Sequence, residues 1–94
     1  MLKDNKDFFI RLEKQLLESS DWPTLYMFKF ILKSENKSVI KLKSLFKEID
    51  SEISTKLSSS EKFISVTIKA KMKSPSLIIE KYKLAAKIEG IISL

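Results

Sequence analysis

The stretch "TLYMFKFIL", residues 24–32, decides the fold of this chain. Its alternate positions form two sets, and one of them is wholly apolar: Tyr26, Phe28, Phe30 and Leu32. The other set carries a single charge and consists of Leu25, Met27, Lys29 and Ile31. A period of two with aromatic and β-branched residues is typical of a strand, and apolar residues in both sets are typical of a central strand. We therefore predict a central strand over residues 24–32, with its aromatic face in the core.

Three other segments show the 3.6-residue spacing of amphipathic helices, and we predict helices over residues 4–19, 37–50 and 75–86. The apolar arc of the first consists of Phe8, Phe9, Leu12 and Leu16. The stripe of the second consists of Val39, Leu42, Leu45, Phe46 and Ile49. The stripe of the third consists of Ile78, Ile79, Tyr82, Ala85 and Ala86. Leu77 and Leu84 fall outside this last stripe and need another cover.

Capping residues indicate where these helices begin. Asp4 or Asn5 can cap the first helix, and Asn36 can cap the second. Ser74 stands before Pro75, which is the usual order of an N-cap followed by proline at the first helical position. The helix starts are therefore expected close to residues 4, 37 and 75.

Alternation predicts three further strands, near residues 51–58, 62–73 and 88–94. The clearest pattern is in the segment 62–73, whose inward set is Ile64, Val66, Ile68, Ala70 and Met72. Its outward set is Phe63, Ser65, Thr67, Lys69 and Lys71. The segment 51–58 has one polar face, which is typical of a strand at a sheet edge, and the polar "SSSE" after it predicts a hairpin. Gly90 marks where the last strand begins or bends.

The order of these elements predicts the α+β class. We expect a ferredoxin-like βαββαβ sandwich, in which a four-stranded antiparallel sheet carries two helices on one face, with an added N-terminal helix. Residues 1–21 form the N-terminal helix extension and residues 22–94 form the ferredoxin-like, ACT-like domain. A chain of 94 residues with 44% hydrophobic content has room for one modest core, so we expect no second domain.

Composition excludes several kinds of chemistry. The chain contains no cysteine and no histidine, so it has no disulfide framework, no thiolate nucleophile, and neither the commonest general base nor the commonest metal ligand. We expect no enzyme activity, no catalytic residues, no metal site and no cofactor. The charged N-terminus does not fit a signal peptide, and no apolar run approaches the length of a membrane span. We therefore expect a cytoplasmic protein without membrane contact.

The distribution of the charges favours a solvated lysine-rich surface over nucleic-acid binding. The formal net charge is +6, but acidic residues are scattered among the lysines and Arg11 is the only arginine. RNA-binding modules of related topology display aromatic residues on the open face of the sheet. Phe63 is the only aromatic residue in the outward sets of the two central strands. Weak nucleic-acid binding is therefore the third hypothesis.

Three separated motifs carry a family resemblance. "WPTLYMFKFIL", "KFISVTIKAKMKSP" and "KIEGIISL" together resemble the small YbeD-like bacterial proteins of unknown function, in the form typical of Bacteroidetes. The resemblance covers at least residues 22–94. It implies a ferredoxin-like fold similar to that of ACT regulatory domains, and a regulatory or interaction role without catalytic residues. ACT-type amino-acid binding usually depends on a glycine after the first strand, whereas residues 33–37 are "KSENK". An amino-acid or metabolite sensor is therefore the alternative hypothesis.

The outward side of the sheet is the expected interaction surface. Leu25, Met27, Ile31 and Phe63 would form an exposed apolar patch there, and such patches usually mark contact surfaces. The N-terminal helix, a second copy of the protein or another protein could cover it, and Leu77 and Leu84 raise the same question on the helix side. We predict a small non-enzymatic regulatory or adaptor module that acts through protein contacts, as a homodimer or with an unidentified protein partner.

Overall fold

The computed structural model describes residues 6–19, 21–34 and 36–94. Its elements follow the order α1 (Lys6–Ser19), β1 (Thr24–Lys33), α2 (Asn36–Ser44), β2 (Ser51–Leu57), β3 (Phe63–Met72), α3 (Pro75–Ala85) and β4 (Ile92–Ser93). The predicted caps Asp4 and Asn5 and the side chain of Asn36 lie outside what the structure describes. The α+β class is confirmed.

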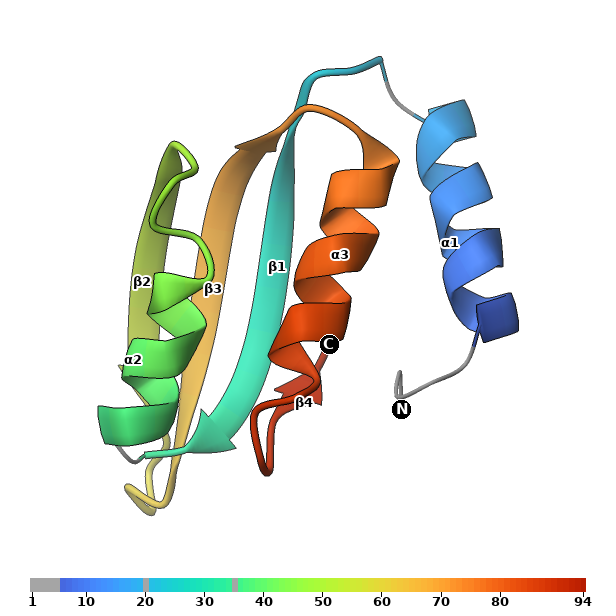
Figure 1. Cartoon of the computed structure of the whole chain (residues 1–94). Helices are drawn as coiled ribbons and strands as arrows, with labels where there is room; N and C mark the ends of the chain where they lie inside the picture. The colour runs from blue at the N-terminus through green and yellow to red at the C-terminus, as the bar shows by residue number, and fades with distance from the viewer. Residues whose placement is uncertain (1–5, 20, 35) are drawn as a thin grey trace.

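The four strands form one sheet in the order β2-β3-β1-β4, and all neighbouring strands are antiparallel. As predicted, β1 is central, β2 is at an edge, and β2 and β3 form an antiparallel hairpin. Figure 1 shows α2 and α3 over one face of the sheet, with α1 beside α3. We call the sheet face turned away from α2 and α3 the outer face.

The core lies between the sheet and these two helices. Phe28, Phe30 and Leu32 of β1 are buried, and the inward residues of β3 from Val66 to Met72 are buried beside them. The predicted faces of both central strands are therefore confirmed. Tyr26 closes one end of the core, where its hydroxyl lies 2.8 Å from the hydroxyl of Tyr82 on α3. Burial, and then the hydrogen bond with Tyr26, raise the pKa of Tyr82 above its ordinary value.

The second helix is shorter than predicted, because α2 ends at Ser44 and not at residue 50. Beyond it the backbone tightens into bonds between residues three apart: Leu45 N–H donates to the Leu42 carbonyl at 3.2 Å, and Ile49 N–H to the Phe46 carbonyl at 3.1 Å. The predicted apolar stripe still faces the core, with Leu42 and Phe46 buried. The helical spacing therefore predicted the inward side chains correctly, but the predicted end of the α-helix was wrong.

The last strand is also shorter than predicted, with Ile92–Ser93 in place of residues 88–94. The chain leaves α3 through further turns, in which Ile88 N–H donates to the Ala85 carbonyl at 2.9 Å and Ile88 is buried. Gly90 then reverses the chain with a φ of 78°, a conformation that glycine adopts readily. Because the chain is still turning at residues 88–91, these residues cannot pair with β1.

Two details of α3 also differ from prediction. Ala86 is exposed because the helix ends at Ala85, so Ala86 is not part of the buried stripe. Pro75 occupies the start of the helix as predicted, but Ser74 makes no capping bond to the backbone. Its hydroxyl lies instead 3.0 Å from the hydroxyl of Ser76.

The N-terminal helix packs against α3. Phe9 of α1 is buried in the common core, and the ammonium of Lys83 on α3 lies 5.3 Å from the centre of its ring. Trp22 ties the end of α1 to the start of β1, because its indole Nε1–H donates to the Leu16 carbonyl at 3.2 Å. α1 therefore extends the helix layer, and no helix of the described residues covers the outer face (Figure 1).

Candidate functional site

The outer face of the sheet is open to solvent. Of the four residues predicted there, Leu25 is 68% exposed, Met27 50% and Phe63 45%, while Ile31 is partly buried. The alternation of β1 and β3 directs all four away from the buried residues of the same strands. The structure therefore places the predicted interaction residues of both strands on one uncovered surface.

Strand register divides these apolar residues into two groups. Leu25 and Met27 follow one another on the outward side of β1. Ile31 is opposite Ile92 of β4 and diagonal to Phe63, whose direct partner is Lys33. Lys29 and Thr67, which pair with each other, lie between the two groups. Ile92 was not predicted as a surface residue, because the alternation within 88–94 does not reveal which residue of β1 it pairs with.

The outer face is also strongly positive. The strands direct five lysines toward it, which are Lys29, Lys33, Lys56, Lys69 and Lys71. The only acidic side chain that the described strands direct there is Glu52, opposite Lys69. Lysine stems can lie along neighbouring apolar side chains while the ammonium groups remain in water. The surface therefore combines exposed apolar groups with an excess of four positive charges.

The two remaining predicted residues, Leu77 and Leu84, lie on α3, away from the outer face. Both are partly buried. Leu77 packs against the core, and Leu84 lines a shallow hollow of about 360 Å³ together with Glu13 of α1. The structure does not join these two residues to the outer-face groups.

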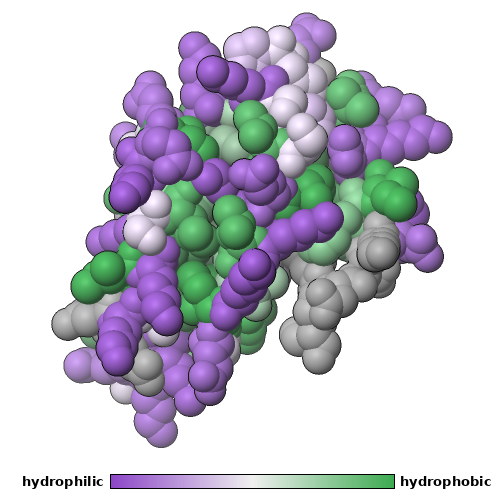
Figure 2. All heavy atoms as spheres, in the orientation of Figure 1, coloured by the Kyte–Doolittle hydropathy of each residue, from purple (hydrophilic) through white to green (hydrophobic). Residues whose placement is uncertain are grey.

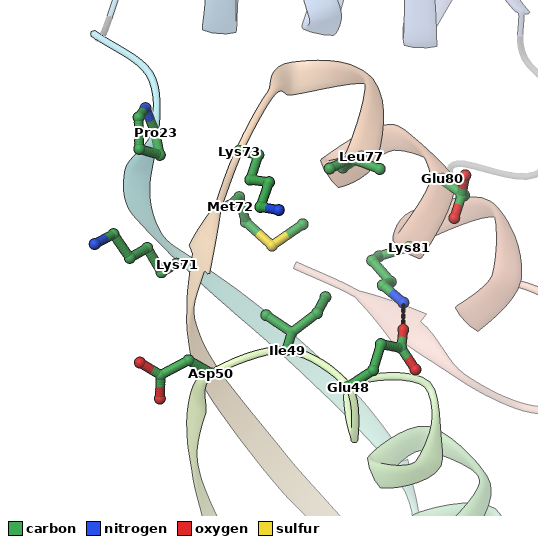
Figure 3. Close-up of a pocket in the computed structure, with 10 residues that line it drawn as sticks. All are labelled: Pro23, Glu48, Ile49, Asp50, Lys71, Met72, Lys73, Leu77, Glu80 and Lys81. Atoms are coloured by element: carbon green, nitrogen blue, oxygen red, sulfur yellow. Dashed lines mark hydrogen bonds and ion pairs between the residues drawn. The ribbon is translucent and has the colours of Figure 1, made fainter.

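A larger hollow of about 600 Å³ lies between the turn after α2, the end of β3 and α3. Its apolar lining includes Ile49, Met72 and Leu77, and charged side chains surround them (Figure 3). Figure 2 shows apolar side chains between α2 and α3, bordered by hydrophilic side chains. The hollow could accept a small molecule that has both apolar and charged parts.

Lys81 of α3 is the unexpected residue of this hollow, because it is only 5% exposed. Its ammonium donates to the Leu45 carbonyl at 2.5 Å and to Glu48 Oε1 at 2.9 Å, and it lies 5.6 Å from the centre of the Phe46 ring. The hydrogen bond from Lys81, and then its charge, hold the pKa of Glu48 below its usual range. Lys81 thus fastens α3 to the turn that follows α2.

Sequence reasoning missed Lys81, although a signal for it exists. Position 81 is three residues after Ile78 and four before Ala85, so it shares the helix face of two residues that were predicted to be buried. A lysine on that face requires acceptors for its ammonium. Only the tertiary structure supplies them, because Leu45 and Glu48 lie more than thirty residues away in the chain.

Within residues 6–19, 21–34 and 36–94, no group of three or more histidine, cysteine or acidic residues is placed to hold a metal ion. No helix in these ranges combines the length and the apolar character needed to cross a bilayer.

Comparison of the chain with protein-family models, with curated proteins and with solved structures gives no match. The resemblance to the YbeD-like proteins therefore stays a prediction.

Proposed function

We propose that this protein is a small, cytoplasmic, non-enzymatic regulatory or adaptor module that acts through protein contacts and works as a homodimer. The observation that supports this function is the uncovered outer face, where Leu25 and Met27 stand in solvent although the chain has a further helix that could have covered them. That helix, α1, packs on α3 instead. An apolar surface left open in this way favours a contact with another protein.

The charge of the outer face indicates what a partner should offer. Each of the apolar residues Leu25, Met27 and Phe63 is directly opposite a lysine on the neighbouring strand. A partner surface with apolar side chains and carboxylates would match both features, because complementary charges increase association rates and select between partners. We expect the partner surface to be acidic.

We also propose that the fold is ferredoxin-like. The strand order β2-β3-β1-β4, with antiparallel neighbours and two helices on one face, is compatible with it. The same arrangement supports the resemblance to YbeD-like and ACT-like proteins. A fold of this kind hosts many functions, so the interaction role depends on the outer face and not on the topology.

Substitution of Met27 tests the interaction role. Met27→Lys and Met27→Glu should both leave the fold intact, because the side chain is directed away from the core. Both should lower the recovery of the partner by at least about tenfold in quantitative affinity capture from the native organism, because each replaces an apolar contact with a charged group that must lose its water. If the partner is acidic, Met27→Glu should have the larger effect, since it adds like-charge repulsion.

The matched control is Leu17→Lys, which makes the same type of change at an apolar residue of α1 that is 57% exposed. Capture should be unchanged in this variant. Melting curves of all three variants should stay close to that of the unsubstituted protein. Equal capture by the Met27 variants and the control would contradict the proposal and leave the outer face as ordinary exposed surface.

The second candidate function, an amino-acid or metabolite sensor, is supported by the hollow around Lys81. An ammonium has three N–H donors, and two of those of Lys81 have acceptors in Leu45 and Glu48. The remaining donor could bind a ligand carboxylate above the apolar lining of Met72 and Leu77.

A thermal-shift screen of the twenty amino acids tests this second candidate. A ligand at about one hundred times its Kd should stabilise the fold by about 2.7 kcal/mol, which is a clear shift of the melting temperature for a domain of this size. The shift should disappear in Leu77→Lys, which fills the hollow. No shift with any amino acid would rule out the amino-acid form of the sensor.

A further inference from the structure

The free edge of β2 has the properties of a self-pairing strand. β2 forms seven consecutive pairs with β3, without interruption, and no strand among the described residues pairs with its other side. It contains neither proline nor a bulge, which are devices that commonly block the edges of sheets. The opposite edge belongs to β4, which has only two residues. β2 is therefore the edge at which the sheet can be extended.

The pairing with β3 determines which backbone groups of β2 are free. Ser58 N–H donates to the Phe63 carbonyl at 2.8 Å, and Lys71 N–H donates to the Asp50 carbonyl at 3.2 Å. In an antiparallel ladder every second residue makes such bonds, so the even-numbered residues of β2 direct their N–H and C=O groups toward β3. The groups directed to the open edge are those of Ser51, Ile53, Thr55 and Leu57.

An antiparallel copy of β2 matches these groups when Ser54 faces itself across a two-fold axis. Ser51 is then opposite Leu57 of the second copy and Ile53 is opposite Thr55, so free donors and acceptors meet along the whole strand. All seven residues pair in this arrangement. A shift of the register by two residues in either direction leaves some of them unpaired. A shift by a single residue would place the free backbone groups of one copy opposite groups of the other copy that are already bonded to β3.

The same register pairs opposite charges. Glu52 of one copy faces Lys56 of the other, and the two-fold axis repeats the contact. Both side chains are exposed in the single chain. They lie in positions without direct hydrogen bonds between the strands, where opposite side chains approach most closely. The charges of β2 are therefore arranged symmetrically about Ser54 in the way that self-pairing requires.

We propose that two copies of this protein dimerise by antiparallel pairing of their β2 strands, with Ser54 on the two-fold axis. This inference rests on the homodimer part of the proposed function and assigns its contact. Face-to-face association through the outer face would instead bring five lysines and one glutamate of each copy against the same set. Edge pairing avoids this repulsion, and it joins the two outer faces into one larger surface for an acidic partner.

Charge reversal at the two paired positions tests the register. Sedimentation equilibrium should show a dimer for the unsubstituted protein, and Glu52→Lys and Lys56→Glu should each raise its dissociation constant by at least about tenfold, because two attractive contacts become repulsive. The first variant presents two lysines to its partner and the second presents two glutamates. An equimolar mixture of the two should therefore form a one-to-one dimer.

The double variant Glu52→Lys/Lys56→Glu separates this contact from effects within one copy. Glu52 also faces Lys69 of its own sheet, and both Glu52→Lys and the double variant lose that pair. Recovery of the dimer in the double variant can thus come only from pairing between copies. Lys87→Glu, which reverses an exposed charge beyond α3, is the control and should leave the dimer unchanged.

The outcomes also separate this inference from the proposed function. A protein that stays monomeric at concentrations of about 100 μM would overturn edge pairing, while the capture experiment with the Met27 variants would still stand as the test of the outer face. A dimer that Met27→Lys breaks and that both charge reversals leave intact would place the contact on the outer face and overturn the edge assignment. A dimer that changes with none of these variants would likewise overturn it.

Discussion

Phe28→Ala should lower the free energy of unfolding by about 3 to 5 kcal/mol. Phe28 is 0% exposed and occupies the middle of a cluster of aromatic rings. Its ring centre is 4.8 Å from that of Tyr26, 5.0 Å from that of Phe46 and 5.3 Å from that of Tyr82. These three rings belong to β1, to the turn after α2 and to α3. The substitution therefore opens a cavity between the sheet and the helices that cover it.

Urea unfolding followed by circular dichroism measures this loss. Met27→Ala is the matched control, because it shortens the neighbouring side chain on the outer face and should cost less than about 1 kcal/mol. Small domains are stabilised by only about 5 to 15 kcal/mol, so Phe28→Leu provides a milder variant with an intermediate loss if the alanine variant does not fold. A near-neutral Phe28→Ala together with a large loss in Met27→Ala would mean that the two faces of β1 are reversed.

Phe9→Ala should cost about 3 kcal/mol or more, the second largest effect expected. Phe9 is 5% exposed, its ring meets that of Phe8 edge to face at 5.7 Å, and the ammonium of Lys83 lies above it. The burial of Phe9 in the common core and its contact with Lys83 attach α1 to α3. A loss of this size would show that α1 unfolds together with the rest of the chain.

Ile10→Ala is the control for this prediction, since Ile10 is 65% exposed on the same helix and should contribute little. Chemical unfolding of both variants, together with the fluorescence of Trp22 at the end of α1, would report on the helix and on the sheet at once. A near-neutral Phe9→Ala would mean that α1 contributes little to the core and that the domain begins near residue 22.

The faces of the strands could be read directly from the sequence. In β1 the alternate residues from Tyr26 to Leu32 are all apolar, as are those from Ile64 to Met72 in β3, and a slip of one residue would move either set into water. Only one orientation of each strand therefore buries its apolar residues. The outward direction of Leu25, Met27 and Phe63 follows from the same alternation, which is why their exposure could be predicted. The edge position of β2 was predictable for a related reason, because one of its faces is polar.

Local patterns could not predict where elements end or what covers them. Both an α-helix and the tighter turn that the chain forms would direct the apolar residues of 45–49 to the core. The length of α2 therefore depends on how this turn packs against β3 and α3. The burial of Lys81 depends on acceptors contributed by a distant turn. The pairing of Ile92 with Ile31 depends on where the chain completes its turn after α3.

By itself, the sequence determined the α+β class, the antiparallel hairpin, the inward faces of the central strands and an outward surface with Leu25 and Met27. Each of these features follows from a short-range period that only one burial pattern satisfies. The tertiary structure alone decided that α1 packs on α3, that the outer face stays open with its lysines, and which backbone groups of β2 are directed away from β3. The physical reason is that these features depend on contacts and open edges between segments far apart in the chain, which no local period encodes.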